Sequence, residues 1–175
     1  MADPSAGRVA GFFHAGVTVL DMEASLRFYR DGLGLEVSFD GESAVTNARQ
    51  IWNIDPERVR VVFLTVPGSD AFVELFEFMG IERHPASARP CDYGAGHLCL
   101  FIEDAEALHR HMVELGFRSR AGQVVTIQTG PHAGAKVAYL IDPDGYHVEV
   151  YEKAPGVRDI VARLAEGDVT TPQAS

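Results

Sequence analysis

Long apolar runs are missing from this chain of 175 residues. A membrane-spanning helix needs roughly 18 or more consecutive apolar residues, and no stretch of the sequence approaches that length. The first ten residues, MADPSAGRVA, also lack the basic region and the apolar core of a secretory signal. We therefore expect a cytoplasmic protein without a membrane partner.

Basic residues are scarce as well, because 15 lysines and arginines stand against 25 acidic residues and the formal net charge is -10. Nucleic acids require a basic face on their partner. No Lys/Arg run supplies one, so we expect no nucleic-acid partner. Cysteine is limited to Cys91 and Cys99, without a CxxC pair. This usage suits two reduced thiols and disfavours a disulfide framework or a structural zinc knuckle.

The sequence contains an internal repeat. Val73–Phe78 reads VELFEF and Val148–Lys153 reads VEVYEK, each with a Glu in second place. The first copy follows HAGVTVLDMEASLRFYRDGLGL, and the second follows HLCLFIEDAEALHRHMVELGF. Both stretches begin with a His, continue as an alternating strand, reach an Asp seven residues later and then read as a helix up to a Gly. A repeat of this kind predicts two copies of one structural unit.

Both predicted helices have recognisable ends. Asp21 and Asp104 are well placed as N-caps, because an Asp side chain accepts from the free backbone N–H groups of the first turn. Gly34 and Gly116 stand where the apolar stripe stops, and glycine commonly ends a helix. Strand-like runs then follow at 35–40, 58–66 and 71–79 in the first copy and at 117–122 (weak), 124–129, 136–142 and 146–152 in the second.

This order of elements predicts an α+β protein built from two βαβββ modules. The first module spans residues 10–79 and the second spans residues 97–153. The stretch 80–96 is rich in Pro, Gly and Ser, as expected of a linker. Residues 154–175 form a tail in which a short helix is possible.

Strand alternation decides which side chains share a face of a sheet. The aliphatic residues of each strand fall on one face, which leaves His14, Glu74, His97 and Glu149 on the other. One such Glu or His alone is as well explained by contact with solvent or by an ordinary core position. Four matched residues in two copies are different, because a strand carboxylate is costly unless it is paired or metal-bound. Two imidazoles and two carboxylates suit a divalent metal, so we predict these four residues as its ligands.

The motifs together resemble the vicinal oxygen chelate superfamily, of the glyoxalase, bleomycin resistance and dioxygenase type. The matching stretches are HAGVTVLDMEASLRFYRDGLGLEV, VELFEF, GHLCLFIEDAEAL and YLIDPDGYHVEVYE. The resemblance implies that the two modules form a U-shaped open barrel around one divalent metal. The metal positions of the family match His14, Glu74, His97 and Glu149. The modules of such proteins pair either within one chain or across a homodimer, and the sequence leaves both arrangements open.

The resemblance also implies a reaction class. Four protein ligands leave two adjacent positions on an octahedral metal, which suits a small substrate that chelates through vicinal oxygens. The implied protein is a lyase or isomerase, closest in pattern to methylmalonyl-CoA epimerase and glyoxalase I. The metal, Ni, Co, Mn or Zn, would stabilise an enolate or enediolate while Glu149 or Glu74 moves the proton. The epimerase pattern suggests a second base at Glu57.

Departures from the family pattern keep alternatives open. Thr18 and Phe78 stand where bacterial glutathione-dependent glyoxalases carry Arg and Asn, which argues against glutathione. One alternative is an Fe(II)-dependent extradiol-type dioxygenase in which Glu74 does not bind the metal. Another is a metal-free protein that binds a small molecule such as a drug.

Other residues have more ordinary interpretations. His147 shares a face with Glu149 and could support the metal ligands from behind, although its place at the start of a strand favours contact with water. His132 and Lys136 belong to a loop that could border a substrate, although solvated loop positions explain them as well. The aromatic residues that could line an apolar pocket, or belong to the core, are Trp52, Phe76, Phe78 and Phe101.

Overall fold

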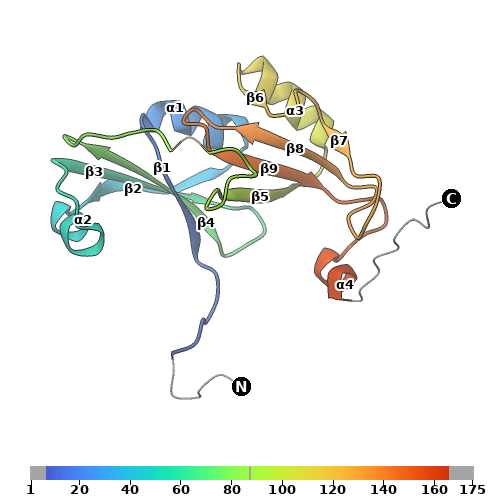
Figure 1. Ribbon diagram of the computed structural model, residues 1–175, viewed down its shortest axis with the longest axis horizontal. Coiled ribbons are helices and arrows are strands. Elements are labelled where there is room, and N and C mark those ends of the chain that lie inside the picture. Colours follow the sequence, from blue (N-terminus) through green and yellow to red (C-terminus); the bar gives the residue numbers. More distant parts are fainter. Residues whose placement is uncertain (1–6, 87, 166–175) are drawn as a thin grey trace. The chain divides into compact units, whose positions relative to one another are not determined.

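The computed structural model describes residues 7–86 and 88–165, which form two β-sheets accompanied by short helices (Figure 1). The α+β class expected from the sequence is confirmed. Contacts divide the described residues into two units, one of residues 7–22 and 35–81 and the other of residues 23–34 and 82–165. No helix among these residues is both long and apolar enough to cross a membrane.

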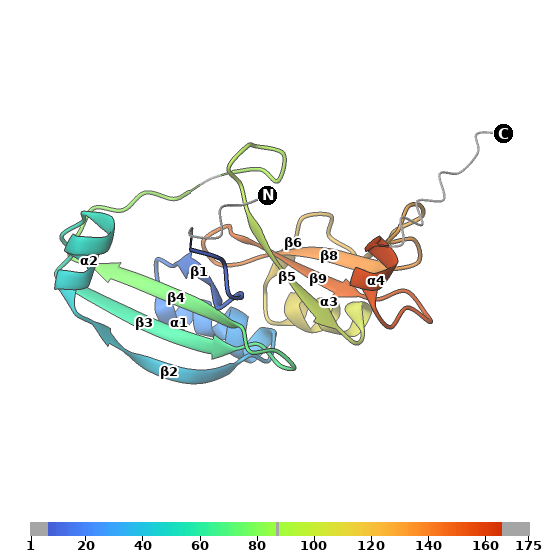
Figure 2. The same cartoon turned by 90° about the horizontal axis from the view of Figure 1, so that it is seen from below.

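The sheet of the first unit consists of β1 (His14–Thr18), β2 (Glu36–Ser43), β3 (Arg58–Thr65) and β4 (Phe72–Met79). The strand order is β1-β4-β3-β2, and Figure 2 shows these strands side by side with β2 outermost. β1 runs parallel to β4, whereas β3 is antiparallel to both of its neighbours. The first and last strands of the repeat are therefore adjacent.

The sheet of the second unit consists of β5 (His97–Ile102), β6 (Arg118–Ser119), β7 (Val125–Thr126), β8 (Lys136–Ile141) and β9 (His147–Glu152). Its order is β5-β9-β8-β6, with β7 also paired to β8. β5 runs parallel to β9, and β8 is antiparallel to β9. The same connectivity thus occurs twice, which confirms the predicted repeat of strands.

The aliphatic face of each sheet is buried, as strand alternation predicts. In the first unit the buried face includes Val17, Val62, Leu64, Val73 and Leu75. In the second unit it includes Leu100, Ala138, Leu140, Val148 and Val150, and helix α3 (Ala105–Glu114) packs on β8 and β9. Burial of these side chains leaves the opposite face of each sheet for the His and Glu residues.

The predicted start of the second helix is confirmed by a capping hydrogen bond. Asp104 caps α3, because its side chain accepts from the backbone N–H of Ala107 at 2.9 Å. The first helix starts as α1 (Met22–Leu26) and continues as a π-helix, η1 (Arg27–Gly32). Gly34 follows with φ of +74°, a backbone conformation that glycine adopts without strain. The change to π-helical geometry was not predicted from the sequence.

Helix α2 (Val45–Trp52) is a second element that the sequence pattern did not predict. Its N-cap position, Ala44, has no side-chain acceptor, so the usual start signal is missing. Trp52 packs edge-on against Phe76 and Phe78, with ring centroids 5.3 and 5.6 Å apart. This aromatic packing on β4 holds the helix in place.

The stretches predicted as linker and tail are described in part. Residues 82–86 and 88–96 contain no helix or strand, and they belong to the second unit. A short helix, α4 (Ile160–Ala165), occurs in the predicted tail. The rest of that tail, residues 166–175, lies outside the described residues.

A buried hydrogen bond joins the helix of the first repeat to a turn of the second. The Tyr29 hydroxyl donates to Oδ2 of Asp142 at 3.0 Å. Asp142 also accepts from the backbone N–H groups of Asp144 (3.0 Å) and Tyr146 (2.7 Å). Asp142 is only 3% exposed, and burial raises its pKa although these hydrogen bonds oppose the rise. Residues 23–34 are thereby fixed to the second unit.

We expect Tyr29→Phe to lower the free energy of unfolding by about 1–2 kcal/mol, because it removes one buried hydrogen bond to a carboxyl group. Asp142→Ala should cost more, about 2–4 kcal/mol, since it leaves three donors without an acceptor. Urea unfolding measures both. Tyr93→Phe is the control, because Tyr93 is fully exposed. Equal stability of Tyr29→Phe and the control would contradict the assignment.

Candidate functional site

His14 and Glu74 form a pair on the first sheet. Nε2 of His14 lies 2.9 Å from Oε2 of Glu74, and the Glu74 side chain is only 9% exposed. The rings of Phe13 and Phe63 meet the imidazole edge-on, at centroid distances of 4.8 and 5.9 Å. The pair therefore lies in largely apolar surroundings.

These surroundings disfavour a charge on Glu74. Burial raises the pKa of Glu74, and the smaller effect of His14 lowers it. Nδ1 of His14 is buried and has no hydrogen-bond partner among the described residues. A cation bound beside Glu74 would offset the cost of burying its carboxylate.

His97 and Glu149 form the corresponding pair on the second sheet, with Nε2 and Oε2 3.1 Å apart. Tyr139 contacts both residues, because its hydroxyl donates to Oε2 of Glu149 at 3.1 Å and lies 3.3 Å from Nε2 of His97. Desolvation, followed by the charge of Glu149, raises the pKa of Tyr139 to about 12. The hydroxyl thus keeps its proton at neutral pH and remains a donor to Glu149.

The two pairs occupy equivalent positions in the two sheets. Gly16 faces Glu74 across β1 and β4, and Cys99 faces Glu149 across β5 and β9. Each His precedes that facing residue by two positions, so it lies on the same side of the sheet as the Glu. On the antiparallel neighbour, Phe63 faces Glu74 and Tyr139 faces Glu149. The hydroxyl beside Glu149 therefore has no counterpart beside Glu74.

The four residues fit a divalent metal in donor type and in spacing within each pair. Imidazole nitrogen and carboxylate oxygen bind such ions at roughly 2.1 Å, so two ligands at right angles lie about 3.0 Å apart. The observed separations of 2.9 and 3.1 Å match this value and also suit a hydrogen bond. Over residues 7–86 and 88–165, no group of three or more His, Cys, Asp or Glu side chains forms a metal-type cluster. The structure thus brings the predicted ligands together as two pairs.

Cys99 faces Glu149 across β5 and β9. Desolvation raises its pKa to about 12, and the neighbouring Glu149 carboxylate acts in the same direction. A thiol with such a pKa stays protonated at neutral pH and is a poor nucleophile. Cys91 and Cys99 are not joined by a disulfide in the structure.

Glu57 lies away from Glu74. It is exposed in the turn before β3, its backbone N–H donates to the carbonyl of Met79, and its side chain covers Gly80. Met79 is five residues beyond Glu74 on β4, which corresponds to roughly 16 Å along a strand. The structure therefore does not bring Glu57 together with the His14 pair.

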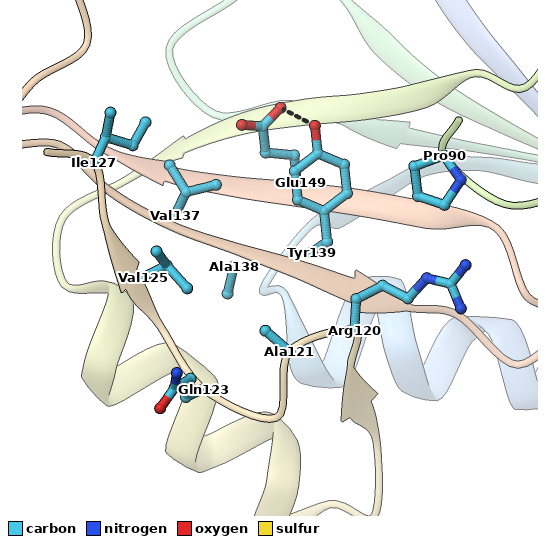
Figure 3. A pocket seen from close by; sticks show the side chains of 10 residues that line it. All are labelled: Pro90, Arg120, Ala121, Gln123, Val125, Ile127, Val137, Ala138, Tyr139 and Glu149. Atoms are coloured by element: carbon cyan, nitrogen blue, oxygen red, sulfur yellow. Dashed lines mark hydrogen bonds between the residues drawn. The ribbon is translucent and has the colours of Figure 1, made fainter. Parts of the chain in front are cut away.

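A pocket of about 420 Å³ opens in the second unit beside the His97 pair. Its lining residues are Pro90, Arg120, Ala121, Gln123, Val125, Ile127, Val137, Ala138, Tyr139 and Glu149 (Figure 3). The volume falls in the range of small-molecule sites, and apolar side chains dominate the lining. Glu149 and Tyr139 thus belong both to the residue pair and to a pocket wall.

Sequence reasoning missed Tyr139 and Arg120 and misplaced His147. Tyr139 could have been found from the alternation in Lys136–Ile141, because it shares a face with Glu149 across β8 and β9. His147 was expected to contact water but is only 5% exposed. Burial lowers its pKa, as do the charges of Arg120 and, to a smaller extent, His97. Its pairing with β5 and β8 encloses it, because β9 is the middle strand of the three.

The remaining predicted residues have structural partners. Nδ1 of His132 lies 2.9 Å from the Tyr151 hydroxyl, and Lys136 pairs with Glu152 at 3.6 Å. Phe101 packs edge-on against Tyr151, with ring centroids 5.7 Å apart. None of these residues lines the pocket shown in Figure 3.

Comparison with known proteins supports the predicted resemblance. The family model described as the Glyoxalase/Bleomycin resistance protein/Dioxygenase superfamily matches residues 11–150. A 2-epi-5-epi-valiolone epimerase from an Actinomyces species is 25% identical over 149 residues, which cover 82% of this chain and 79% of that protein. A probable chloroplastic lactoylglutathione lyase from Arabidopsis thaliana is 27% identical over 146 residues. That match covers 81% of this chain and 35% of the longer plant protein.

Solved structures share the fold. A glyoxalase family protein from Bacillus cereus has a TM-score of 0.73 at 15% identity, covering 87% of this chain and 99% of that one. Glyoxalase I from Leishmania major has a TM-score of 0.56 at 22% identity, covering 91% and 95%. At these identities the likeness concerns the architecture.

The raised pKa of Glu74 predicts a pH-dependent effect of Glu74→Gln in metal-free protein. The folded state holds the Glu74 proton more tightly than the unfolded chain does, so the contribution of Glu74 to stability falls as pH rises through that window. We therefore expect the variant to gain stability relative to wild type as pH rises above the ordinary pKa of a glutamate side chain. Urea unfolding with a chelator present measures this difference.

Glu77→Gln is the matched control, since Glu77 lies on the same strand and outside the pair. We expect no comparable change with pH in this variant. A Glu74→Gln variant whose stability relative to wild type falls over the same range would contradict the prediction.

Proposed function

Because the chain belongs to the Glyoxalase/Bleomycin resistance protein/Dioxygenase superfamily, we propose that it is a divalent-metal-dependent lyase or isomerase. Its substrate would be a small molecule that presents two neighbouring oxygens. The observation that carries the proposal is the His–Glu pair that recurs in the same register in both sheets. The similarity to proteins named as an epimerase and as a lyase supports this choice of reaction class.

We assign His14, Glu74, His97 and Glu149 as the residues that hold the metal. A divalent cation would supply positive charge that stabilises a negative charge developing on a substrate oxygen. The protein supplies neutral imidazoles and carboxylates, and the burial of Glu74 supports a role in binding a cation. The Tyr139 hydroxyl orients Glu149 by donating to its Oε2.

Glu149 is the proposed proton carrier, because it also lines the pocket. In the proposed step its carboxylate accepts a proton from the carbon next to a carbonyl group, and the C–H electron pair moves toward the carbonyl oxygen. Return of the proton to the other face of that carbon gives epimerisation. Where the same carbon bears a hydroxyl group, return of the proton to the former carbonyl carbon gives isomerisation, because the hydroxyl proton passes to the former carbonyl oxygen and the hydroxyl-bearing carbon becomes the new carbonyl. No external oxidant is needed in either case.

The aromatic cluster on β4 favours an epimerase-type substrate over a glutathione adduct. Phe78 is buried, stacks on Phe76 at 5.9 Å and meets Trp52 at 5.6 Å. The position that carries Asn in glutathione-dependent bacterial relatives is therefore filled by apolar packing. The Phe78 side chain offers no polar group to glutathione.

Metal content tests the proposal first. We expect one equivalent of nickel, cobalt, manganese or zinc per chain purified without chelator or affinity tag, and we expect its loss in His97→Ala, since that variant removes a nitrogen ligand. Two equivalents would indicate one ion at each pair. His84→Ala is the control, because His84 is an exposed linker residue. Absence of metal after incubation with divalent ions would leave a metal-free binding protein, and iron with dioxygen uptake would indicate an oxygenase.

Exchange of the substrate α-proton with deuterated solvent tests the proton carrier. We expect Glu149→Gln to abolish exchange on acyl-CoA, hydroxyketone or hemithioacetal substrates that the wild type turns over. Glu57→Gln tests the second base suggested by the epimerase pattern. Because Glu57 lies roughly 16 Å from Glu74 along the strand, we expect exchange to continue in that variant. Loss of exchange in Glu57→Gln would contradict this expectation and indicate that Glu57 acts as the second base.

Tyr139→Phe tests how Glu149 is oriented. Removal of a hydrogen-bond partner of a ligating carboxylate typically weakens metal binding by 10–100-fold, and we expect about tenfold here. Competition with a chromophoric chelator measures this affinity without turnover. Tyr93→Phe is the control, and equal affinities of the two variants would contradict an orienting role for Tyr139.

A further inference from the structure

The pocket of the second unit contains one cation among its lining residues, Arg120. The backbone N–H of Arg120 donates to the carbonyl of Tyr139 at 2.8 Å, which fixes its position beside that strand. Figure 3 shows Arg120 and Pro90 at one end of the pocket, Glu149 and Tyr139 between, and Ile127 toward the other end. The pocket thus has a charged end and an apolar end.

The Arg120 guanidinium has no ion pair or side-chain hydrogen bond within the part of the chain that the structure describes. Other arginines among the described residues do pair with Asp or Glu, including Arg30, Arg49, Arg58, Arg60 and Arg89. Arg120 is therefore available to a ligand.

His147 lies within range of the Arg120 charge and is almost fully buried. It does not neutralise Arg120, because an imidazole carries either no charge or a positive charge. With a formal net charge of -10 the protein repels anions at long range, so a single unpaired guanidinium selects them only at close contact.

We propose that this pocket binds a small, mostly apolar carboxylic acid, with its carboxylate on Arg120 and its apolar body against Val125, Ile127 and Val137. A guanidinium binds a carboxylate through two parallel N–H···O bonds. Glu149 and Tyr139 lie between the two ends of the pocket. An oxygen-bearing carbon of the same ligand would face Glu149 and Tyr139. This placement rests on the proposed function.

Binding of matched acids and amides to the full chain tests the inference. The probes are benzoate, 3-phenylpropanoate, 4-phenylbutanoate and octanoate, their primary amides, and phenylphosphonate, all measured by ligand-observed NMR with a chelator present. We expect at least one acid to bind about tenfold more tightly than its amide, because a charge-assisted pair replaces a neutral contact. Arg120→Met should remove this preference and leave amide binding unchanged.

Arg118→Met is the matched control, since Arg118 is exposed on β6, two residues earlier, and does not line the pocket. It removes the same charge and should keep the acid preference. Three results would overturn the inference: equal binding of every acid and its amide, an acid preference that survives Arg120→Met, or equal losses in both variants. Tighter binding of the phosphonate than of every carboxylate would also overturn it.

This test is independent of the proposed metal chemistry, because it uses neither metal nor turnover. If the protein binds acids more tightly than amides but binds no divalent metal, the carboxylate site is supported and only the proposed function is contradicted. Metal binding and α-proton exchange without any acid preference would contradict the carboxylate site alone.

Discussion

Parallel pairing of the first and last strands within each repeat is the constraint on which the candidate site depends. In a parallel pair the register sets which residues face each other, and here it brings a His on one strand within 2.9 or 3.1 Å of a Glu on the other. A shift of one residue would send the Glu to the opposite face, into the buried aliphatic side chains. The fold therefore fixes the chemistry of the site through hydrogen bonds of the backbone.

The two copies have diverged at the residues around each Glu. Glu74 faces Phe63 and Glu149 faces Tyr139, so only the second carboxylate receives a side-chain hydroxyl. Burial disfavours charge on Glu74, whereas Glu149 remains near a pocket with a cationic residue. A duplicated unit has thus produced two unlike halves: one carboxylate in apolar surroundings and one in contact with polar groups. Such a difference is what separate roles for the two carboxylates require.

Local chemistry made much of this predictable. Alternation identified the His and Glu residues, and Asp104 marked a helix start, because both signals depend only on neighbours in sequence. Features set by distant partners were missed. The π-helix turns Phe28 onto Phe117 and Tyr29 onto Asp142, and α2 is held by aromatic packing on β4. The positions of Tyr139 and Arg120 in the pocket were missed, because they depend on how β8 pairs with its neighbours. Whether all four ligands share one ion stays a prediction.

The path of the chain between its two units has a consequence for robustness. Residues 7–22 belong to the first unit, 23–34 to the second, 35–81 to the first and 82–165 to the second. A protease that cuts once in the linker would therefore leave residues 23–34 on the N-terminal fragment, while most of the second unit lies on the C-terminal fragment. The two fragments would be held together without a covalent link, in part by the hydrogen bond from Tyr29 to Asp142. Separation of the fragments would expose Phe28 and Tyr29, which are fully buried in the intact protein, so the second unit is incomplete without the N-terminal fragment.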